Sequence, residues 1–186
     1  MRIIAGKHRG RAIEAPPGDA VRPTSDRARE SLFNILAHGK LAADGAAYAG
    51  AAVLDAFAGT GALGLEALSR GASSAFFLEN GRAALQTLRR NIAALGEGER
   101  ARIVSGGATA PPAALAACRL VFLDPPYRSG LGTKALAALA KAGWLAEGAL
   151  AVLEVAKSEE ATAPEGFTLL EERRYGAARL LFLRRN

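Results

Sequence analysis

The chain has 186 residues, half of them hydrophobic, which suits one ordinary domain with a sizeable core. No apolar run approaches the roughly 20 residues of a membrane span, and the start lacks the apolar stretch of a signal peptide, so we expect a soluble cytoplasmic protein. One cysteine and two histidines exclude an internal disulfide and are too few for a zinc cluster, while a net charge of +6 points to a polyanionic partner.

Basic residues gather at both ends of the chain. Before Glu14 the sequence carries Arg2, Lys7, Arg9 and Arg11 without a single acid, and the last 14 residues are again rich in arginine. Cations that neutralise phosphates release counterions, so such a stripe suits RNA. A merely solubilising surface explains the same charges, and composition leaves both interpretations open.

The first 40 residues predict a basic arm followed by one helix. Apolar and polar residues alternate over the first 15, as in a small β-hairpin. A hydroxyl side chain, Thr24 or Ser25, can then cap an amphipathic helix that ends near Gly39. We expect this part to pack on a single globular unit formed by residues 41–186.

From residue 51 on, apolar strands alternate with amphipathic helices. The predicted order is a segment 51–72 with a buried strand, a glycine turn and a helix, then strand 73–80, helix 82–95, strand 101–106, a short helix near Ala113, strand 119–124, helix 131–142 and strand 149–155. Strands separated in this way indicate a parallel sheet covered on both faces. The last two runs, 167–175 and 178–184, have only two residues between them and should pair as an antiparallel hairpin. The predicted fold class is therefore α/β, a doubly wound, mostly parallel seven-stranded sheet with an antiparallel C-terminal hairpin.

A glycine turn, Asp55-Ala56-Phe57-Ala58-Gly59-Thr60-Gly61, lies where the first of these strands passes into its helix. Glycine lets the backbone approach a ligand closely, and the helix N-terminus favours a negative group such as a carboxylate. A tight structural turn is the alternative. Glu79 favours the ligand, because an acid at the end of the second strand commonly binds ribose hydroxyls in doubly wound nucleotide sites.

The stretch Phe122-Leu123-Asp124-Pro125-Pro126-Tyr127 ends the fourth predicted strand. Neither proline has an N–H to donate, so the sheet ladder must stop there. The stiff corner fixes the directions of the Asp124 carboxylate, the Pro125 carbonyl and the Tyr127 ring. It falls on the same carboxyl edge of the sheet as the glycine turn and Glu79, where doubly wound sheets bind ligands. A stiff loop with a core tyrosine is the structural alternative.

Taken together, the motifs resemble a known family. The segments MRIIAGKHRGR, RPTSDRARESLFNIL, LDAFAGTGALGLEALSRGA and FLDPPY are closely similar to the RsmD family of class I S-adenosylmethionine-dependent methyltransferases, which methylate a guanine N2 in bacterial small-subunit ribosomal RNA. The resemblance extends over nearly the whole chain. It implies S-adenosyl-L-methionine as cofactor, 16S ribosomal RNA or an assembling small ribosomal subunit as partner, no metal, and a monomeric Rossmann-like enzyme.

The resemblance also implies roles for individual residues. An exocyclic purine amine is a poor nucleophile because its lone pair is delocalised into the ring, so its two N–H bonds need hydrogen-bond acceptors. The catalytic set is Asp124, Pro125, Pro126 and Tyr127. It supplies these acceptors, and the tyrosine supplies a ring that stacks on an extruded base. The cofactor set is Asp55, Phe57, Gly59, Gly61, Glu79 and Thr24, and the RNA-binding set is Arg2, Lys7, Arg9, Arg11 and Arg22.

One position departs from the superfamily pattern. The third strand there usually ends in an Asp or Asn that binds the adenine amino group, whereas this chain has Gly106 and Gly107. The adenine contact then falls to a backbone carbonyl or to the hydroxyl of Ser105 or Thr109.

Two other functions compete with this interpretation. DNA adenine-N6 methyltransferases also carry the DPPY motif, but they usually have a sizeable target-recognition segment, and residues 61–124 are fully used by predicted strands and helices. A non-catalytic RNA-binding assembly factor could keep the cofactor fold. The intact Asp124 corner argues against this second function.

Overall fold

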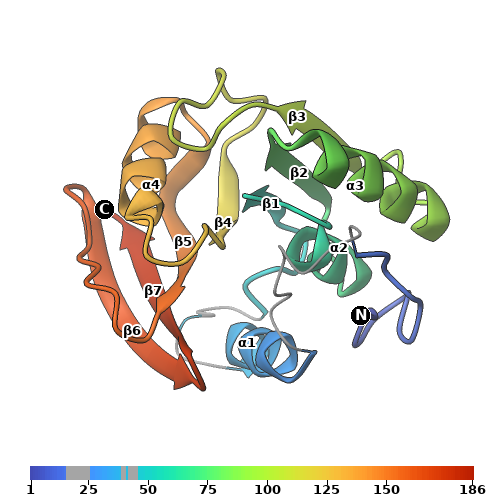
Figure 1. Ribbon diagram of the computed structural model, residues 1–186, viewed down its shortest axis with the longest axis horizontal. Helices are drawn as coiled ribbons and strands as arrows, with labels where there is room; N and C mark the ends of the chain where they lie inside the picture. The colour runs from blue at the N-terminus through green and yellow to red at the C-terminus, as the bar shows by residue number, and fades with distance from the viewer. Residues whose placement is uncertain (16–25, 39–40, 42–45) are drawn as a thin grey trace.

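The computed structural model describes residues 1–15, 26–38, 41 and 46–186, which form a mixed sheet with helices on both faces (Figure 1). The strand order is β3-β2-β1-β4-β5-β7-β6. Strands β1 to β5 pair in parallel, and β7 runs antiparallel to both β5 and β6. The predicted doubly wound seven-stranded sheet with its antiparallel hairpin is confirmed.

The elements have these bounds in chain order: α1 (Asp26–His38), β1 (Ala52–Ala56), α2 (Ala62–Ser69), β2 (Ser74–Glu79), α3 (Arg82–Leu95), β3 (Ala101–Ser105), β4 (Cys118–Leu123), α4 (Leu131–Lys141), β5 (Leu145–Ala156), β6 (Phe167–Tyr175) and β7 (Ala178–Arg185). Strand β5 begins four residues before the predicted one. None of the helices in the described part of the chain is long and apolar enough to cross a membrane.

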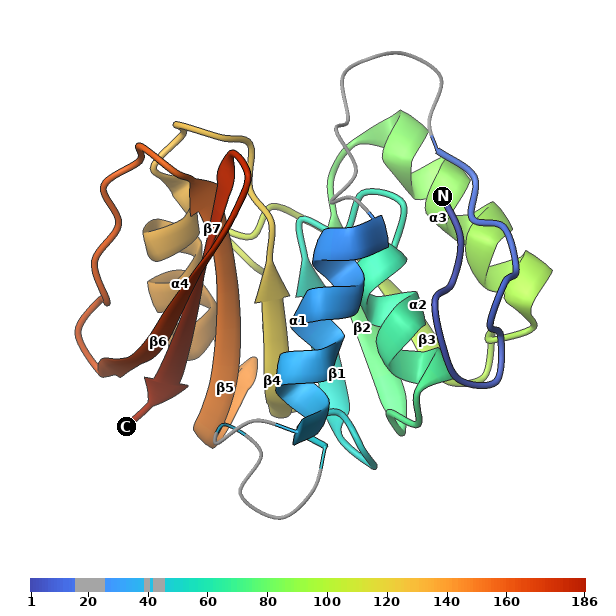
Figure 2. The same ribbon diagram turned by 90° about the horizontal axis from the view of Figure 1, so that it is seen from below.

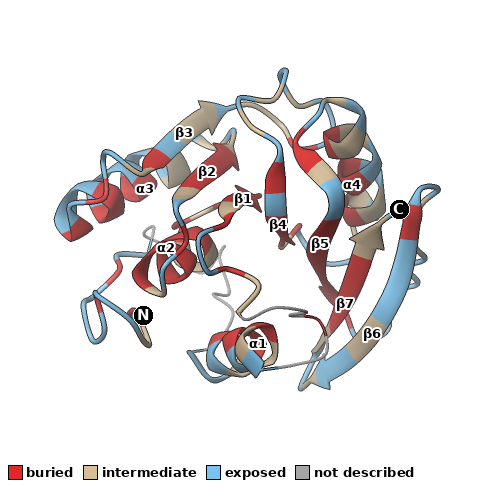
Figure 3. Cartoon of the chain, turned by 180° about the vertical axis from the view of Figure 1, so that it is seen from behind, coloured by how far each residue is buried: buried red, intermediate tan, exposed pale blue. Residues whose placement is uncertain are grey.

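Successive residues of the central strands pack on opposite faces of the sheet, as the period of a β-strand requires. Val53 belongs to one core cluster, together with side chains of α1, α2 and α3. Its neighbour Leu54 belongs to a second cluster, together with side chains of α4 and the buried Trp144. Figure 2 shows α1 beside α2 in front of the central strands. Because both faces are covered, the central strands are largely apolar, whereas the edge strand β6 is largely exposed (Figure 3).

The short helix predicted near Ala113 is wrong. Residues 111–117 form a loop, in which Pro111 and Pro112 have no N–H for helix bonds. The loop bonds instead to the end of α4: the carbonyl of Pro112 accepts the indole N–H of Trp144 at 2.9 Å, and Ala114 donates to the carbonyl of Ala142 at 3.1 Å.

The N-terminal arm folds back on itself like a short hairpin, although neither side is long enough to count as a strand. Its two sides meet in one antiparallel bridge, Arg2 with Ala12, and three backbone hydrogen bonds join them. Other backbone N–H groups of the arm bond to α2: Ile4 and Ala5 donate to the carboxylate of Glu66 at 2.8 and 3.1 Å, and Lys7 donates to the carbonyl of Ser69 at 2.8 Å. The arm is therefore fixed along α2.

Buried ion pairs join α1 to the part of α2 that binds the arm. Glu66 has no exposed surface, and its carboxylate contacts Arg70 at 2.6 Å and the fully buried Arg29 at 3.8 Å. The predicted caps of this helix, Thr24 or Ser25 and Gly39, lie outside the described residues.

Candidate active site

The predicted site residues of three strands come together at the carboxyl edge of the sheet. Strand β1 pairs with both β2 and β4, and Ala56 is level with Leu78 on one side and Leu123 on the other. The glycine turn, Glu79 and the Asp124 corner therefore follow three neighbouring strand ends. A cavity of about 190 Å³ opens among them, lined by Phe57, Leu78, Glu79, Asn80, Gly106, Gly107, Ala108, Thr109, Pro126 and Leu131.

The glycine turn contains one non-glycine residue with an unusual backbone conformation. Phe57 has a φ of 64°, a left-handed conformation that is uncommon for an aromatic residue and is often found at functional sites. A Cβ on Gly59 would have only the carbonyl oxygen of Phe57 near it, at 3.9 Å, so this glycine presents open backbone. A Cβ on Gly61 would lie 2.4 Å from a methyl carbon of Leu88, so Gly61 is required for packing between α2 and α3.

Glu79 fixes the turn from the end of β2. One carboxylate oxygen accepts the N–H of Gly59 at 2.8 Å, and the other accepts those of Asn80 at 2.8 Å and Gly81 at 2.7 Å. A carboxylate has about four acceptor sites, so one remains for a ligand hydroxyl after these three bonds. The half-buried Glu79 therefore both shapes the turn and faces the cavity.

Asp55 lies beneath the turn, with only 2% of its surface exposed. Its carboxylate accepts the backbone N–H of Gly64 in the first turn of α2 at 2.8 Å. Burial raises the pKa of Asp55 to about 8, although the Gly64 bond opposes this, and the nearby charges of Asp124 and Glu79 raise the pKa further. Among the described residues that line the cavity Asp55 is absent, so it supports the turn from below.

The two glycines at the end of β3 form part of the cavity wall. A Cβ on Gly106 would meet Pro112 at 3.1 Å, whereas one on Gly107 would meet only the side-chain nitrogen of Asn80, at 3.6 Å. Sequence reasoning missed Asn80; the signal was its position directly after Glu79 at a strand end. Of the two hydroxyl residues expected to replace the adenine contact, Thr109 lines the cavity and Ser105 does not, within the described part of the chain.

The corner after β4 passes from the buried sheet to the surface. Asp124 is half-buried, Pro125 is buried, and Pro126 is exposed. Tyr127 is 42% exposed, so the alternative of a core tyrosine is wrong. Its hydroxyl donates to the carboxylate of Glu154 on β5 at 2.6 Å. Glu154 was also missed, although an acid within the apolar strand sequence LAVLEVA was the available signal.

Those predicted RNA-binding residues that the structure describes are not gathered beside this corner. Arg22 and Thr24 lie outside the described residues. Lys7 forms an ion pair with Glu97, just beyond α3, at 3.6 Å, and Arg9 is exposed in the same turn of the arm. This turn lies against the last residue of α2, and α2 rises about 12 Å over its 8 residues away from the carboxyl edge.

Two other arginines of the arm contact α1 and α3 directly. Arg2 approaches Asp26 at the start of α1, at 3.9 Å, and the Arg11 side chain donates to the carbonyl of Ala94 in α3. Both side chains belong to exposed residues. Sequence reasoning overlooked two other exposed cations, Arg128 directly after Tyr127 and Lys157 directly after β5, which lie at the carboxyl edge itself.

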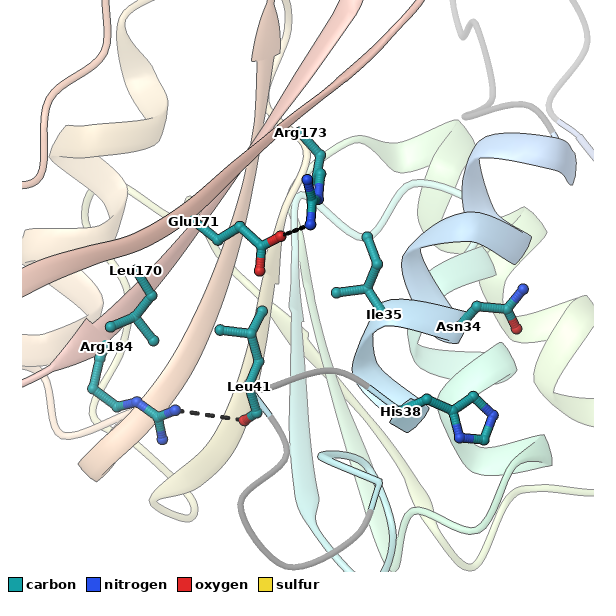
Figure 4. A pocket seen from close by; sticks show the side chains of 8 residues that line it. All are labelled: Asn34, Ile35, His38, Leu41, Leu170, Glu171, Arg173 and Arg184. Carbon is teal, nitrogen blue, oxygen red and sulfur yellow. Dashed lines mark hydrogen bonds and ion pairs between the residues drawn. The ribbon is translucent and has the colours of Figure 1, made fainter.

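A second, larger cavity of about 1190 Å³ lies between α1 and the β6–β7 hairpin (Figure 4). It is lined by Asn34, Ile35, His38, Leu41, Leu170, Glu171, Arg173 and Arg184. Its arginines are already engaged: Arg173 pairs with Glu171, and Arg184 donates to the carbonyl of Leu41 at 3.5 Å. Its described lining contains none of the predicted site residues, so the carboxyl edge is the better candidate for chemistry. No group of three or more His, Cys, Asp or Glu side chains within the described ranges is placed to hold a metal ion.

Comparison with known proteins gives the family. Residues 1–184 match the family model described as conserved hypothetical protein 95. Ribosomal RNA small subunit methyltransferase D of Escherichia coli K12 is 44% identical over 155 residues, which are 83% of this chain and 74% of that protein. The protein of the same name from Haemophilus influenzae is 35% identical over 180 residues, 95% of this chain and 89% of that one. The solved structure of yhhF from Escherichia coli, described as a methyltransferase, superposes with a TM-score of 0.82 at 40% identity and covers all of this chain and 97% of that chain. The chain therefore belongs to the ribosomal RNA small subunit methyltransferase D (RsmD) family and has its class I, Rossmann-like fold.

Proposed function

We propose that the protein transfers a methyl group from S-adenosylmethionine to the exocyclic N2 amine of a guanine in small-subunit ribosomal RNA. The observation that supports this most is the meeting of the Asp124 corner with the glycine turn and Glu79 at one edge of the sheet. Relatives that carry the name ribosomal RNA small subunit methyltransferase D supply the substrate class.

The residues around the smaller cavity fit the cofactor. Glu79 keeps one acceptor site for a ribose hydroxyl, Gly107 leaves open backbone at the cavity, and Gly59 presents open backbone in the turn that Glu79 holds. The N-terminus of α2, beyond Gly61, favours the cofactor carboxylate. Asp55 and Phe57 hold the turn, and Thr24 completes the proposed set from a part of the chain outside the described residues. When bound, S-adenosylmethionine supplies a methyl group on a sulfonium sulfur, so the chemistry needs no metal.

The Asp124 corner then activates the amine. The Asp124 carboxylate and the Pro125 carbonyl accept the two N–H bonds, which draws the nitrogen lone pair out of the ring and towards the methyl group. Pro126 keeps both acceptors at a fixed angle, and Tyr127 stacks on the extruded base. An ionised carboxylate suits guanine better than adenine, because guanine offers N1–H beside its amine whereas adenine offers an acceptor there.

The fold also argues against the two competing functions. Residues 62–123 are occupied by α2, β2, α3, β3, a loop and β4, which leaves no target-recognition segment of the DNA adenine type between the motifs. An assembly factor without catalysis would have no need of a half-buried Asp124 beside an exposed Tyr127.

RNA contacts are proposed on two surfaces. Arg128 and Lys157 would hold phosphates next to the target base, and the basic arm, with Arg2, Lys7, Arg9 and Arg11, would hold RNA farther along the side of α2. Arg22, which lies outside the described residues, completes the proposed RNA-binding set. We propose that the enzyme acts as a monomer in the cytoplasm, on 16S ribosomal RNA or an assembling small subunit.

Labelled S-adenosylmethionine with either naked ribosomal RNA or small-subunit particles that lack the modification tests the proposal. Asp124→Ala should abolish transfer while calorimetry shows unchanged cofactor affinity, because the lost acceptor acts at the reacting nitrogen. Asp124→Asn keeps one acceptor oxygen and should retain weak activity. Full turnover by Asp124→Ala would reject the role of this corner.

A further inference from the structure

The hydroxyl of Tyr127 is anchored by an acid from the neighbouring strand. It donates to the Glu154 carboxylate at 2.6 Å, and Glu154 is only 7% exposed. Strands β4 and β5 pair with Leu123 level with Leu153, so Glu154 follows at the level of Asp124. A buried carboxylate thus holds the polar end of a ring whose surface is 42% exposed.

A second acid holds the segment that follows the ring. The Glu159 carboxylate accepts the backbone N–H of Arg128 at 2.7 Å and that of Gly130 at 3.3 Å. Arg128 has a φ of 58°, a left-handed conformation that a long side chain rarely adopts and that persists only where the surroundings impose it. The turn after Tyr127 is therefore fixed from the end of β5 independently of the hydroxyl bond.

We propose that Glu154 is a positioning residue for the target base: it holds the Tyr127 ring in the orientation in which an extruded guanine stacks on it beside Asp124. This inference rests on the proposed function. A ring held at its backbone and at its hydroxyl has little rotamer freedom left to lose when the base arrives, so binding is stronger than to a free ring. Glu154 acts through Tyr127 and does not touch the reacting atoms.

A purely structural role for Glu154 makes a different prediction. Loss of a buried acid would then lower stability and leave the KM for RNA unchanged in the folded enzyme. Under the proposal, Glu154→Ala and Tyr127→Phe break the same bond. Each should raise the KM for RNA roughly 2- to 12-fold, which corresponds to the cost of ordering one side chain on binding.

The test compares Glu154→Ala, Glu154→Gln, Tyr127→Phe and the double variant Glu154→Ala/Tyr127→Phe, with the exposed Glu160→Ala as control. The double variant should be no worse than either single variant, because the two changes remove one interaction. Glu154→Gln keeps an acceptor oxygen and should restore most of the KM, and affinity for S-adenosylmethionine should stay constant throughout. Additive losses, or a glutamine variant as impaired as the alanine variant, would overturn the proposal.

Nuclear magnetic resonance of the free enzyme gives a readout that needs no RNA. The chain has 3 tyrosines, so labelled tyrosine rings give separable signals. The Tyr127 signal should move in Glu154→Ala and return in Glu154→Gln. An unmoved signal rejects the inference, whereas a wild-type enzyme that fails to methylate any ribosomal RNA rejects the proposed function on which it rests.

Discussion

Glu79 connects the end of β2 to the glycine turn, so Glu79→Ala should weaken both the fold and cofactor binding. Its carboxylate accepts the N–H groups of Gly59, Asn80 and Gly81 at 2.8, 2.8 and 2.7 Å. A part-buried N–H that loses its acceptor costs about 1 to 3 kcal/mol. Two of these donors, on Gly59 and Gly81, are part-buried, while that of Asn80 is exposed and can bind water. We therefore expect the free energy of unfolding to fall by about 2 to 6 kcal/mol.

Cofactor affinity should fall as well. The ribose contact adds a further loss of about 1 to 3 kcal/mol in binding, which corresponds to roughly 5- to 150-fold weaker affinity. Urea denaturation measures the first effect, and calorimetry with S-adenosylmethionine, at a temperature where the variant is folded, measures the second. Glu79→Gln keeps one acceptor oxygen, so its stability and cofactor affinity should lie between those of the wild type and Glu79→Ala. The exposed Glu99→Ala serves as control. A Glu79→Ala protein with unchanged stability and unchanged affinity would refute this account of the turn.

Other consequences follow from the buried polar groups. Glu66→Ala would remove the acceptor of the Ile4 and Ala5 N–H groups and leave the buried Arg29 with Asp26 alone as ion-pair partner. It should lower the free energy of unfolding by about 3 to 5 kcal/mol in urea denaturation, where a loss below about 1 kcal/mol would be incompatible with the contacts described. The pKa of Asp55 is raised from 3.8 to about 8, so between these pH values the folded state keeps a proton that the unfolded chain releases. The free energy of unfolding should therefore fall as pH rises through this range. Asp55→Asn should flatten this part of the profile in denaturation curves measured at a series of pH values, and an unaltered profile would count against the raised pKa. Burial raises the pKa of Cys118 to about 12, so the native thiol should react with a thiol reagent no faster than the protein unfolds, and rapid labelling would contradict its burial.

The regular part of the fold was readable from the sequence because local patterns determine it. Apolar runs of strand length alternate with amphipathic segments, and the helix at Arg82–Leu95 was predicted with its observed bounds. The strand ends were marked by residues that end strands for chemical reasons, the glycine turn after Ala56 and the prolines after Asp124. Because parallel strands end at one edge, the site followed from their order.

The errors and omissions share a different cause, since they depend on contacts between distant segments. The arm is fixed along α2 because the N–H groups of Ile4 and Ala5 bond to Glu66, some 60 residues away in sequence. The loop near Ala113 is held by bonds to Trp144 and Ala142 that no local pattern shows. The bond from Tyr127 to Glu154 likewise joins neighbouring strands that the sequence separates by a helix.

The finding that the arm is fixed along α2 changes how RNA binding is best tested. Deletion of the arm would leave the carboxylate of Glu66 without two of its N–H donors, so any loss of RNA binding would be mixed with a loss of stability. Substitution of the exposed Arg9 is a cleaner test, with Arg128→Ala as the comparison at the carboxyl edge.

The central claim is tested most directly by the identity of the methylated nucleoside. Ribosomal RNA or small-subunit particles lacking the modification are incubated with the enzyme and S-adenosylmethionine, digested, and analysed by mass spectrometry, with Asp124→Ala as the inactive control. The account predicts N2-methylguanosine from the wild-type enzyme and none from Asp124→Ala. N6-methyladenosine, or N2-methylguanosine formed equally well by Asp124→Ala, would contradict it.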